Sequence, residues 1–270
     1  MIRHAVRSAL TMILLLLAGL AISAARDPLD GRIEHTHLLG ALDLGGELFH
    51  VQGLAIEGAH VWVTSVDRAT RRGYLHEFDR ATGRFLRRVE LTDGPRYHPG
   101  GISAGGGMIW VPVAEMRPDS SATIVALDQH TLRVRRRIRI ADHLGCVAVL
   151  GRTLVAGNWD SRALYILDID DPASLRVVPN PSRTRYQDMK FVDGQLVAGG
   201  PVSWWRGSVD WIDWPSLTLR RSLRAGAIGP IAPFGRGGAL TGEGRAIDGR
   251  DLYVVPEDGP SRLFRFRLDA

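Results

Sequence analysis

Three histidines open three short phrases that resemble one another: His50 begins HVQGL, His98 begins HPGGI and His143 begins HLGCV. Imidazole side chains at equivalent positions can form a metal site or an acid–base set. They can equally be packing residues that are repeated with the phrase, because their wide separation differs from the compact ligand spacing of a zinc motif. Both interpretations stay open, and the sequence identifies neither a metal nor a cofactor.

Two carboxylates, Asp188 and Glu243, are aligned with the third position of the same phrase in later repeats. Neighbouring repeats would bring them close together across a channel, where such a pair can share a proton or coordinate an ion. Glu257 lies in a loop that we expect at the same face. These three carboxylates are the candidate catalytic groups, with acid–base or cation-binding roles.

Charged and aromatic residues also occupy the loops that follow the second strand of each repeat. Arg68, Arg162 and Arg262 would hold an anionic part of a ligand through forked hydrogen bonds. The pair Trp204-Trp205 is either a ligand platform or a cover for the core. The candidate ligand-binding residues are His50, Gln52, Asp67, Arg68, His98, Glu115, His143, Asn158, Asp160, Arg162, Gln187, Lys190, Asp258 and Arg262.

The phrase that carries these residues recurs along the whole chain. Its third position falls at Gln52, Gly100, Gly145, Asp188 and Glu243, which lie 48, 45, 43 and 55 residues apart. A strand-forming period of roughly 40–50 residues is typical of a β-propeller. Each repeat contains short runs of alternating apolar and polar residues between turn residues, which indicates a four-stranded antiparallel sheet. The sequence therefore predicts an all-β, five-bladed β-propeller.

The two ends of the chain complete the fifth repeat. That repeat stops after its third strand, Leu263 to Leu268, while an unused strand, Thr36 to Leu44, stands near the other end. The 27 residues from Gly244 to Ala270 and the 17 residues from Thr36 to Gln52 together make 44, which is one period. We therefore expect the N-terminal strand to complete the last blade and to remove an exposed edge. The stretch from Ala225 to Leu240 is interpreted as a loop rather than a sixth repeat.

Residues 1–25 are typical of a secretory signal peptide, with Arg3 and Arg7 before an apolar run and small residues at its end. The apolar run is shorter than the ~20 residues that a spanning helix needs. We therefore expect cleavage rather than a membrane anchor, and no stable membrane insertion afterwards. The mature protein would be one propeller domain, residues 26–270, in the periplasm or outside the cell.

Composition narrows the classes of partner. Removal of residues 1–25 lowers the net charge from +5 to +3, and no dense basic block remains, which argues against nucleic acid. Cys146 is the only cysteine, so no internal disulfide can form. We expect a monomer that binds a small polar ligand or a peptide.

The sequence contains no nucleophile elbow, phosphate loop or paired-cysteine motif, so whether the protein is an enzyme stays open. One hypothesis places a small polar ligand at the axial face, with hydrolase- or cyclotransferase-like chemistry. The other is a non-catalytic binding or scaffold propeller, in which the same arginines and carboxylates only pair with each other. Enclosed carboxylates would favour the first hypothesis, and a flat, solvated rim would favour the second.

The phrase HVQGL at residues 50–54, followed by Phe78-Asp79 and Thr82-Gly83, resembles the first blade of plant and bacterial glutamine cyclotransferases. The resemblance continues in residues 98–102 and 187–194. It implies an exported five-bladed propeller, of a family that cyclises N-terminal glutamine. Gly100 stands where that family carries a glutamate, and residues 256–259 (PEDG) replace its lysine-bearing phrase, so the resemblance does not carry the reaction over. The loops 158–162 and 256–262 are similar to those of an uncharacterised family of secreted bacterial propellers, which implies no activity.

Overall fold

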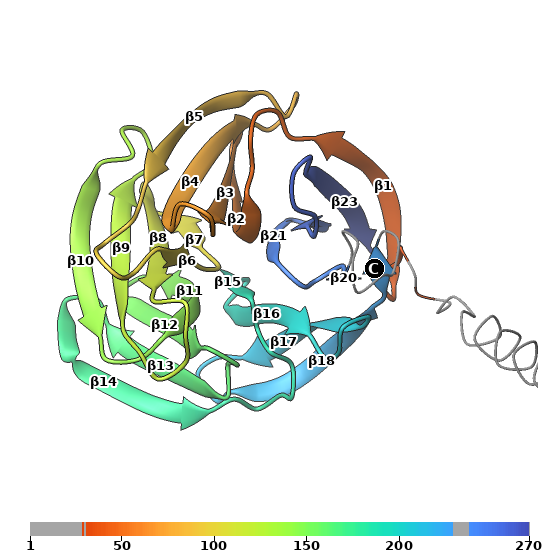
Figure 1. The fold of residues 1–270 in the computed structure, drawn as a ribbon. Helices are drawn as coiled ribbons and strands as arrows, with labels where there is room; N and C mark the ends of the chain where they lie inside the picture. Colours follow the sequence, from red (N-terminus) through yellow and green to blue (C-terminus); the bar gives the residue numbers. More distant parts are fainter. Residues whose placement is uncertain (1–28, 30, 229–237, 270) are drawn as a thin grey trace, which may run out of the picture.

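Five antiparallel sheets follow one another along the chain and surround a common axis, as Figure 1 shows. The computed structural model describes residue 29, residues 31–228 and residues 238–269; the expected signal peptide lies outside these residues. Within them the regular elements are strands, and no helix is long and apolar enough to cross a membrane. The prediction of an all-β, five-bladed propeller is confirmed.

Each blade places its first strand nearest the axis and its last strand at the outside (Figure 1). Blade 1 contains β2 (His50–Glu57), β3 (His60–Asp67), β4 (Arg72–Asp79) and β5 (Phe85–Glu90). Blade 2 contains β6 (His98–Pro99), β7 (Ser103–Gly105), β8 (Met108–Ala114), β9 (Ala122–Asp128) and β10 (Val134–Ile140). Blade 3 contains β11 (Leu144–Leu150), β12 (Thr153–Asn158), β13 (Ala163–Asp168) and β14 (Asp171–Pro179). Blade 4 contains β15 (Asp188–Val192), β16 (Gln195–Pro201), β17 (Gly207–Asp213) and β18 (Thr218–Ala225).

Blade 5 is assembled from both ends of the chain. It contains β21 (Gly244–Asp248), β22 (Asp251–Val255), β23 (Arg262–Leu268) and, as its outer strand, β1 (Thr36–Asp43). β1 pairs antiparallel with β23 in a register that runs from Thr36 opposite Leu268 to Asp43 opposite Arg262. The expected closure of the ring by the N-terminal strand is therefore confirmed. It gives β23 a partner along its outer edge, which an open sheet would leave unpaired.

The inner strand of blade 2 is interrupted between β6 and β7, and both pieces pair with β8. At the interruption, Gly101 turns to blade 3, donating its N–H to Gly145 and forming a parallel bridge with Cys146. The stretch that we interpreted as a loop contains the short strands β19 (Ala227–Ile228) and β20 (Gly238–Ala239), which pair with each other. They form a separate two-stranded ladder and add no sixth blade.

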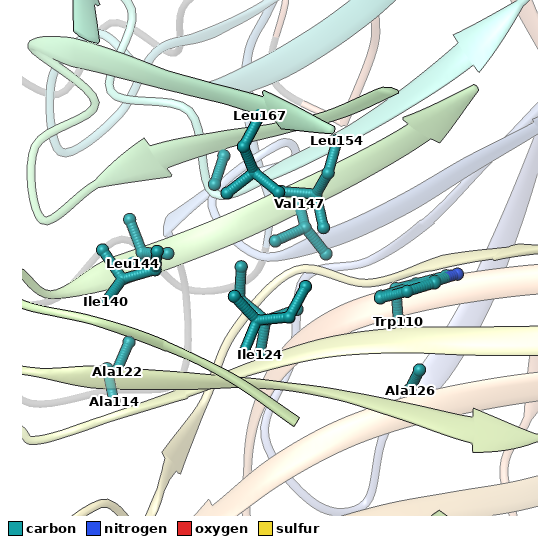
Figure 2. Close-up of a cluster of buried hydrophobic side chains, with 12 residues drawn as sticks. Trp110, Ala114, Ala122, Ile124, Ala126, Ile140, Leu144, Val147, Leu154 and Leu167 are labelled. Atoms are coloured by element: carbon teal, nitrogen blue, oxygen red, sulfur yellow. The ribbon is translucent and has the colours of Figure 1, made fainter. Parts of the chain in front are cut away.

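The hydrophobic core is divided into five clusters, and each cluster lies between two neighbouring blades. Figure 2 shows the cluster between blades 2 and 3, where Ile124 and Trp110 of one sheet lie opposite Val147 and Leu154 of the next. Alternate residues of a strand point to opposite faces of its sheet, so every blade must bury both faces against its neighbours. The ring is therefore stable only when it is closed.

Because β1 closes the ring, we expect a truncation that removes it to destabilise the fold. Deletion of residues 1–44 removes the outer strand of blade 5 and its contacts with Leu263 and Phe264. It leaves an unpaired edge and opens the hydrophobic clusters beside that blade, so we expect loss of the cooperative unfolding transition in thermal circular dichroism. Deletion of residues 1–28 is the matched control, since it removes no described residue. A truncated chain that melts like this control would contradict the role of β1.

Candidate ligand site at the axial face

The five inner strands meet at the axis, where glycines allow the backbones to touch. A Cβ atom on Gly53 would lie 2.5 Å from the carbonyl oxygen of Gly100, and one on Gly100 would lie 1.9 Å from that of Gly145. A Cβ atom on Gly101 would lie 2.3 Å from the carbonyl oxygen of Gln187, and one on Gly244 would lie 2.6 Å from the carbonyl carbon of Gly53. No side chain fits between these strands, so the axis is closed at this level.

Asp188 ties three blades together at the closed level. Its carboxylate is fully buried and accepts hydrogen bonds from the N–H groups of Leu54 in blade 1 (2.9 Å) and Arg245 in blade 5 (3.0 Å). It also accepts hydrogen bonds from the N–H of Met189 (2.9 Å) and from the Lys190 ammonium group. Hydrogen bonds from backbone donors and an ammonium group stabilise a buried carboxylate.

Strand pairing shows that the repeat in blade 4 aligns with the other repeats through Gln187, one residue before the position that the sequence alone indicated. Asp188 lies opposite Gly199 in the same way that Gly53 lies opposite Thr64 and Cys146 opposite Gly157. Gln187, not Asp188, is therefore the structural equivalent of Gln52, Gly145 and Glu243. A shift of one residue moves a side chain to the other face of its strand. For this reason Asp188 does not face the cavity with Glu243.

The same alignment reveals Arg185, which the sequence reasoning missed. The backbone N–H of Arg185 donates to the carbonyl oxygen of Pro201, and Pro201 lies two residues after Gly199, the partner of Asp188. In blade 1, His50 lies opposite Val66, which is likewise two residues after Thr64, the partner of Gly53. Arg185 thus takes the place in blade 4 that histidines occupy in blades 1 to 3. An alignment of the repeats on Gln187 would have found it.

A cavity of about 710 Å³ lies on the axial face above the closed level. Ten of the candidate residues line it: His50, Gln52, Arg68, His98, His143, Asp160, Gln187, Glu243, Glu257 and Asp258. Further lining residues are Met116, Gly145, Trp159, Arg185, Pro201, Ser203, Trp204, Gly238, Ala239, Gly242 and Pro256. The expectation that the opening phrases and the second-strand loops share one face agrees with this arrangement.

Blades 1 and 5 form the charged wall of the cavity. His50 Nδ1 lies 3.0 Å from Asp258, and His50 Nε2 lies 3.9 Å from a carboxyl oxygen of Glu243. Burial alone would lower the pKa of His50, but the hydrogen bond to Asp258 and the charges of Glu243 and Asp258 outweigh it and raise the pKa. Burial tends to raise the pKa of Asp258, but His50 and the Val51 N–H hold it below its usual value.

Glu243 is a carboxyl group of the cavity that has no hydrogen-bond partner among the described residues; Asp160 also has none, but it pairs with Arg162 at 3.7 Å. The side chain of Glu243 is only 21% exposed. Burial raises its pKa to about 7, against the opposing effect of His50 and with a further rise from the charge of Asp258. A buried carboxyl group with a pKa close to neutral can accept or donate a proton at the pH of most cells.

Blades 2 and 3 form a largely uncharged wall, whose one charged lining residue among those described, Asp160, pairs with Arg162 at 3.7 Å. The rings of His98 and His143 lie 5.6 Å apart between centroids, and Trp159 contacts His143 edge-on at 4.5 Å. Burial lowers the pKa of His98 to about 3 and also lowers the pKa of His143, whose Nδ1 lies 2.7 Å from the carbonyl oxygen of Glu115. Within the described residues, no group of three metal-ligating side chains could hold a metal ion.

The remaining candidates lie outside the cavity and have partners of their own. Asp67 bonds Thr70 and Ala69 in its turn, Glu115 bonds Ser121 and Arg117, and Asn158 accepts the N–H of Ala163. The ammonium group of Lys190 donates a hydrogen bond to Asp188. Arg162 pairs with Asp160 at 3.7 Å, and Arg262 forms a two-bond pair with Glu257, which uses the carboxylate of that candidate catalytic residue.

The tryptophans at the cavity mouth are placed unequally. Trp204 lines the cavity and is 79% exposed, while Trp205 beside it does not line the cavity. A tryptophan that exposes this much of its ring covers no core, so the platform interpretation fits Trp204 better than the cover interpretation.

Comparison with known proteins gives a family and two distant likenesses. The model of a family of unknown function (DUF6454) matches residues 34–195. The structure of the Dos1 propeller matches with a TM-score of 0.43 and 14% sequence identity. The match covers 81% of this chain and 53% of the Dos1 chain. The crystal structure of BamB from Moraxella catarrhalis has a TM-score of 0.40 and 12% identity over 83% and 59% of the respective chains. The chain thus spans little more than half the length of either structure, and no curated protein matches it significantly.

We expect substitution of Asp188 to lower the stability of the fold strongly. In Asp188→Asn, an amide N–H group must face backbone N–H donors, and Lys190 loses its counter-charge, so we expect a loss of about 3–5 kcal/mol in the free energy of unfolding. Asp248→Asn is the matched control, because Asp248 forms an exposed pair with Arg80 at 2.6 Å and should cost less than about 1 kcal/mol. Urea unfolding measures both, and equal losses would contradict the role of Asp188.

Because the pKa of Glu243 is raised in the folded chain, we expect the free energy of unfolding to depend on pH. The folded chain holds this proton up to about pH 7, whereas the unfolded chain releases it near the ordinary value of 4.5. The free energy of unfolding should therefore fall as the pH rises between these values and change no further above them. Glu243→Gln removes this loss, so between pH 5 and pH 8 the variant should gain about 1–3 kcal/mol relative to the wild type. Parallel stability–pH curves from urea unfolding would contradict the shifted pKa.

Proposed function

The chain belongs to the family of unknown function DUF6454, and we propose that it is an exported propeller whose axial cavity binds a small polar ligand and exchanges a proton with it. The supporting observation is Glu243, a nearly buried carboxyl group without a hydrogen-bond partner among the described residues, 3.9 Å from His50 in a cavity of about 710 Å³. A concave site with a few converging polar groups and a shifted pKa is the usual arrangement of a ligand site.

The three residues have separate roles in this proposal. Glu243 takes a proton from an N–H or O–H group of the ligand, because its pKa of about 7 makes both protonation states available. His50 is a positioning residue and a source of positive charge beside the ionised Glu243. Asp258 bonds Nδ1 of His50, which orients the ring and directs Nε2 towards Glu243.

The finer proposal is acyl-transfer chemistry of the hydrolase or cyclotransferase type. In a cyclisation of N-terminal glutamine, the α-amine attacks the side-chain carboxamide, a new C–N bond forms and ammonia leaves. Glu243 would take the proton from the attacking amine and return it to the departing nitrogen, so the enzyme ends the cycle unchanged. Asp188, which we expected to take part, lies outside the cavity, and Glu257 is paired with Arg262.

A non-catalytic binding or scaffold propeller is the second candidate function. It is favoured by the pairing of Arg262 with Glu257 and of Arg162 with Asp160 at the rim, as that hypothesis expected. The enclosed Glu243 favours the ligand site. The proposal includes a cleaved signal peptide at residues 1–25, a monomeric domain of residues 26–270 and a location in the periplasm or outside the cell.

Release of ammonia from peptides with N-terminal glutamine tests the finer proposal. We expect a rate that rises with pH around 7 as Glu243 becomes ionised, and a rate about 100-fold lower in Glu243→Gln, the typical contribution of a general base. Glu90→Gln is the matched control, because Glu90 lies on the outer strand β5 and pairs with Arg72. Ammonia release no faster than from peptide alone would overturn the cyclotransferase proposal and leave the binding function.

A further inference from the structure

Two arginines of the cavity differ from the arginines at its rim. Arg162 and Arg262 each pair with a carboxylate. Arg68 and Arg185 line the cavity, their side chains are exposed, and neither guanidinium has a hydrogen-bond or ion-pair partner among the described residues. A guanidinium group without a counter-ion in a concave site attracts anions, because the low-dielectric walls focus its field.

These two arginines stand on either side of blade 5. Arg68 follows β3 in blade 1, and Arg185 precedes β15 in blade 4; in the ring, blade 5 lies between these two blades (Figure 1). Of the carboxylates of blade 5 in the cavity, Asp258 is bonded to His50 and Glu257 to Arg262. Glu243 is the one left over, so two positive groups and one proton-exchanging carboxyl group face the same space.

The opposite wall limits what else the ligand can carry. His98 and His143 are neutral at pH 7 because burial lowers the pKa of each, and Trp159 and Met116 complete a largely aromatic surface. Among the described residues, the one acid on this wall, Asp160, pairs with Arg162. Aromatic faces and a thioether favour a flat or apolar body over a second charge.

We propose that the ligand of this cavity is an organic carboxylate, held at its charged end by Arg68 and Arg185 and packed with a flat, apolar body against the Trp159 wall. The inference rests on the proposed function, since it assigns a ligand class to the same cavity. The planar fork of guanidinium matches a carboxylate with two parallel hydrogen bonds. The protonated form of Glu243 can donate a further hydrogen bond to that carboxylate.

The proposal gives binding a definite pH dependence. The groups that face Glu243 are His50, Asp258 and Arg68. Glu257, Asp160 and Arg185 are the other charged residues that line the same cavity. As the pH rises through about 7, Glu243 becomes negative and repels a carboxylate, and loss of the proton from His50 acts in the same direction. Affinity for a carboxylate should therefore fall with rising pH, and it should fall less in Glu243→Gln.

Isothermal titration calorimetry with matched probes tests the ligand class. Indole-3-acetate, indole-3-acetamide and tryptamine share one aromatic body and differ in charge, and phenyl phosphate against benzoate compares the two anions. At pH 6 we expect the carboxylates to bind at least tenfold more tightly than the amide and the amine, since charge-assisted hydrogen bonds are about twice as strong as neutral ones. Arg68→Gln and Arg185→Gln should each lower carboxylate affinity about tenfold, while Arg135→Gln on the outer strand β10 should leave it unchanged.

The outcomes separate this inference from the proposed function. Equal or tighter binding of the amide or amine, or carboxylate binding that is unaffected by both arginine variants, overturns the carboxylate proposal but leaves a ligand site. Tighter binding of phenyl phosphate than of benzoate also overturns it, in favour of a phosphate ligand. If no probe of any charge binds, both the inference and the proposed ligand site fail.

Discussion

The close contact of five inner strands at the axis is the constraint on which the rest of the structure depends. Gly53, Gly100 and Gly101 leave no room for side chains between neighbouring backbones, and the Asp188 carboxylate binds N–H groups of blades 1, 4 and 5 at the same level. Backbone polar groups that are buried away from bulk water need hydrogen-bond partners. Asp188 supplies them, and in doing so it closes the channel and turns the space above into a cavity with a floor.

Repetition and asymmetry have different roles in this ring. The five interblade clusters repeat the same apolar packing and carry no information about a ligand. Differences appear at one equivalent position, at or just before the start of each inner strand, which is His50, His98 and His143 in three blades and Arg185 in the fourth. The loops add acids, mostly from blade 5, and aromatic rings from blades 3 and 4. The cavity therefore has a charged wall and a largely uncharged wall, although the scaffold beneath it is nearly symmetric.

Pairing decides which charged groups of the cavity are available to a ligand. Glu257 and Asp258 are adjacent in sequence, yet one is held by Arg262 and the other by His50. Glu243 and the two arginines Arg68 and Arg185 keep their hydrogen-bonding capacity. Burial raises the pKa of Glu243, while the two guanidinium groups have no ion-pair partner among the described residues.

The sequence alone determined the architecture, since a strand period is local and the chain ends must pair to complete it: β1 joins β23 as the count of residues required. It also determined most of the cavity, because opening phrases and second-strand loops share one face. Only the tertiary structure decided which candidates line the cavity. Asp188 and Gln187 differ by one position, and strand pairing alone assigns that register. Likewise, Glu243, Glu257 and Asp258 are chemically alike in sequence, and their differences arise from partners and burial that distant segments provide.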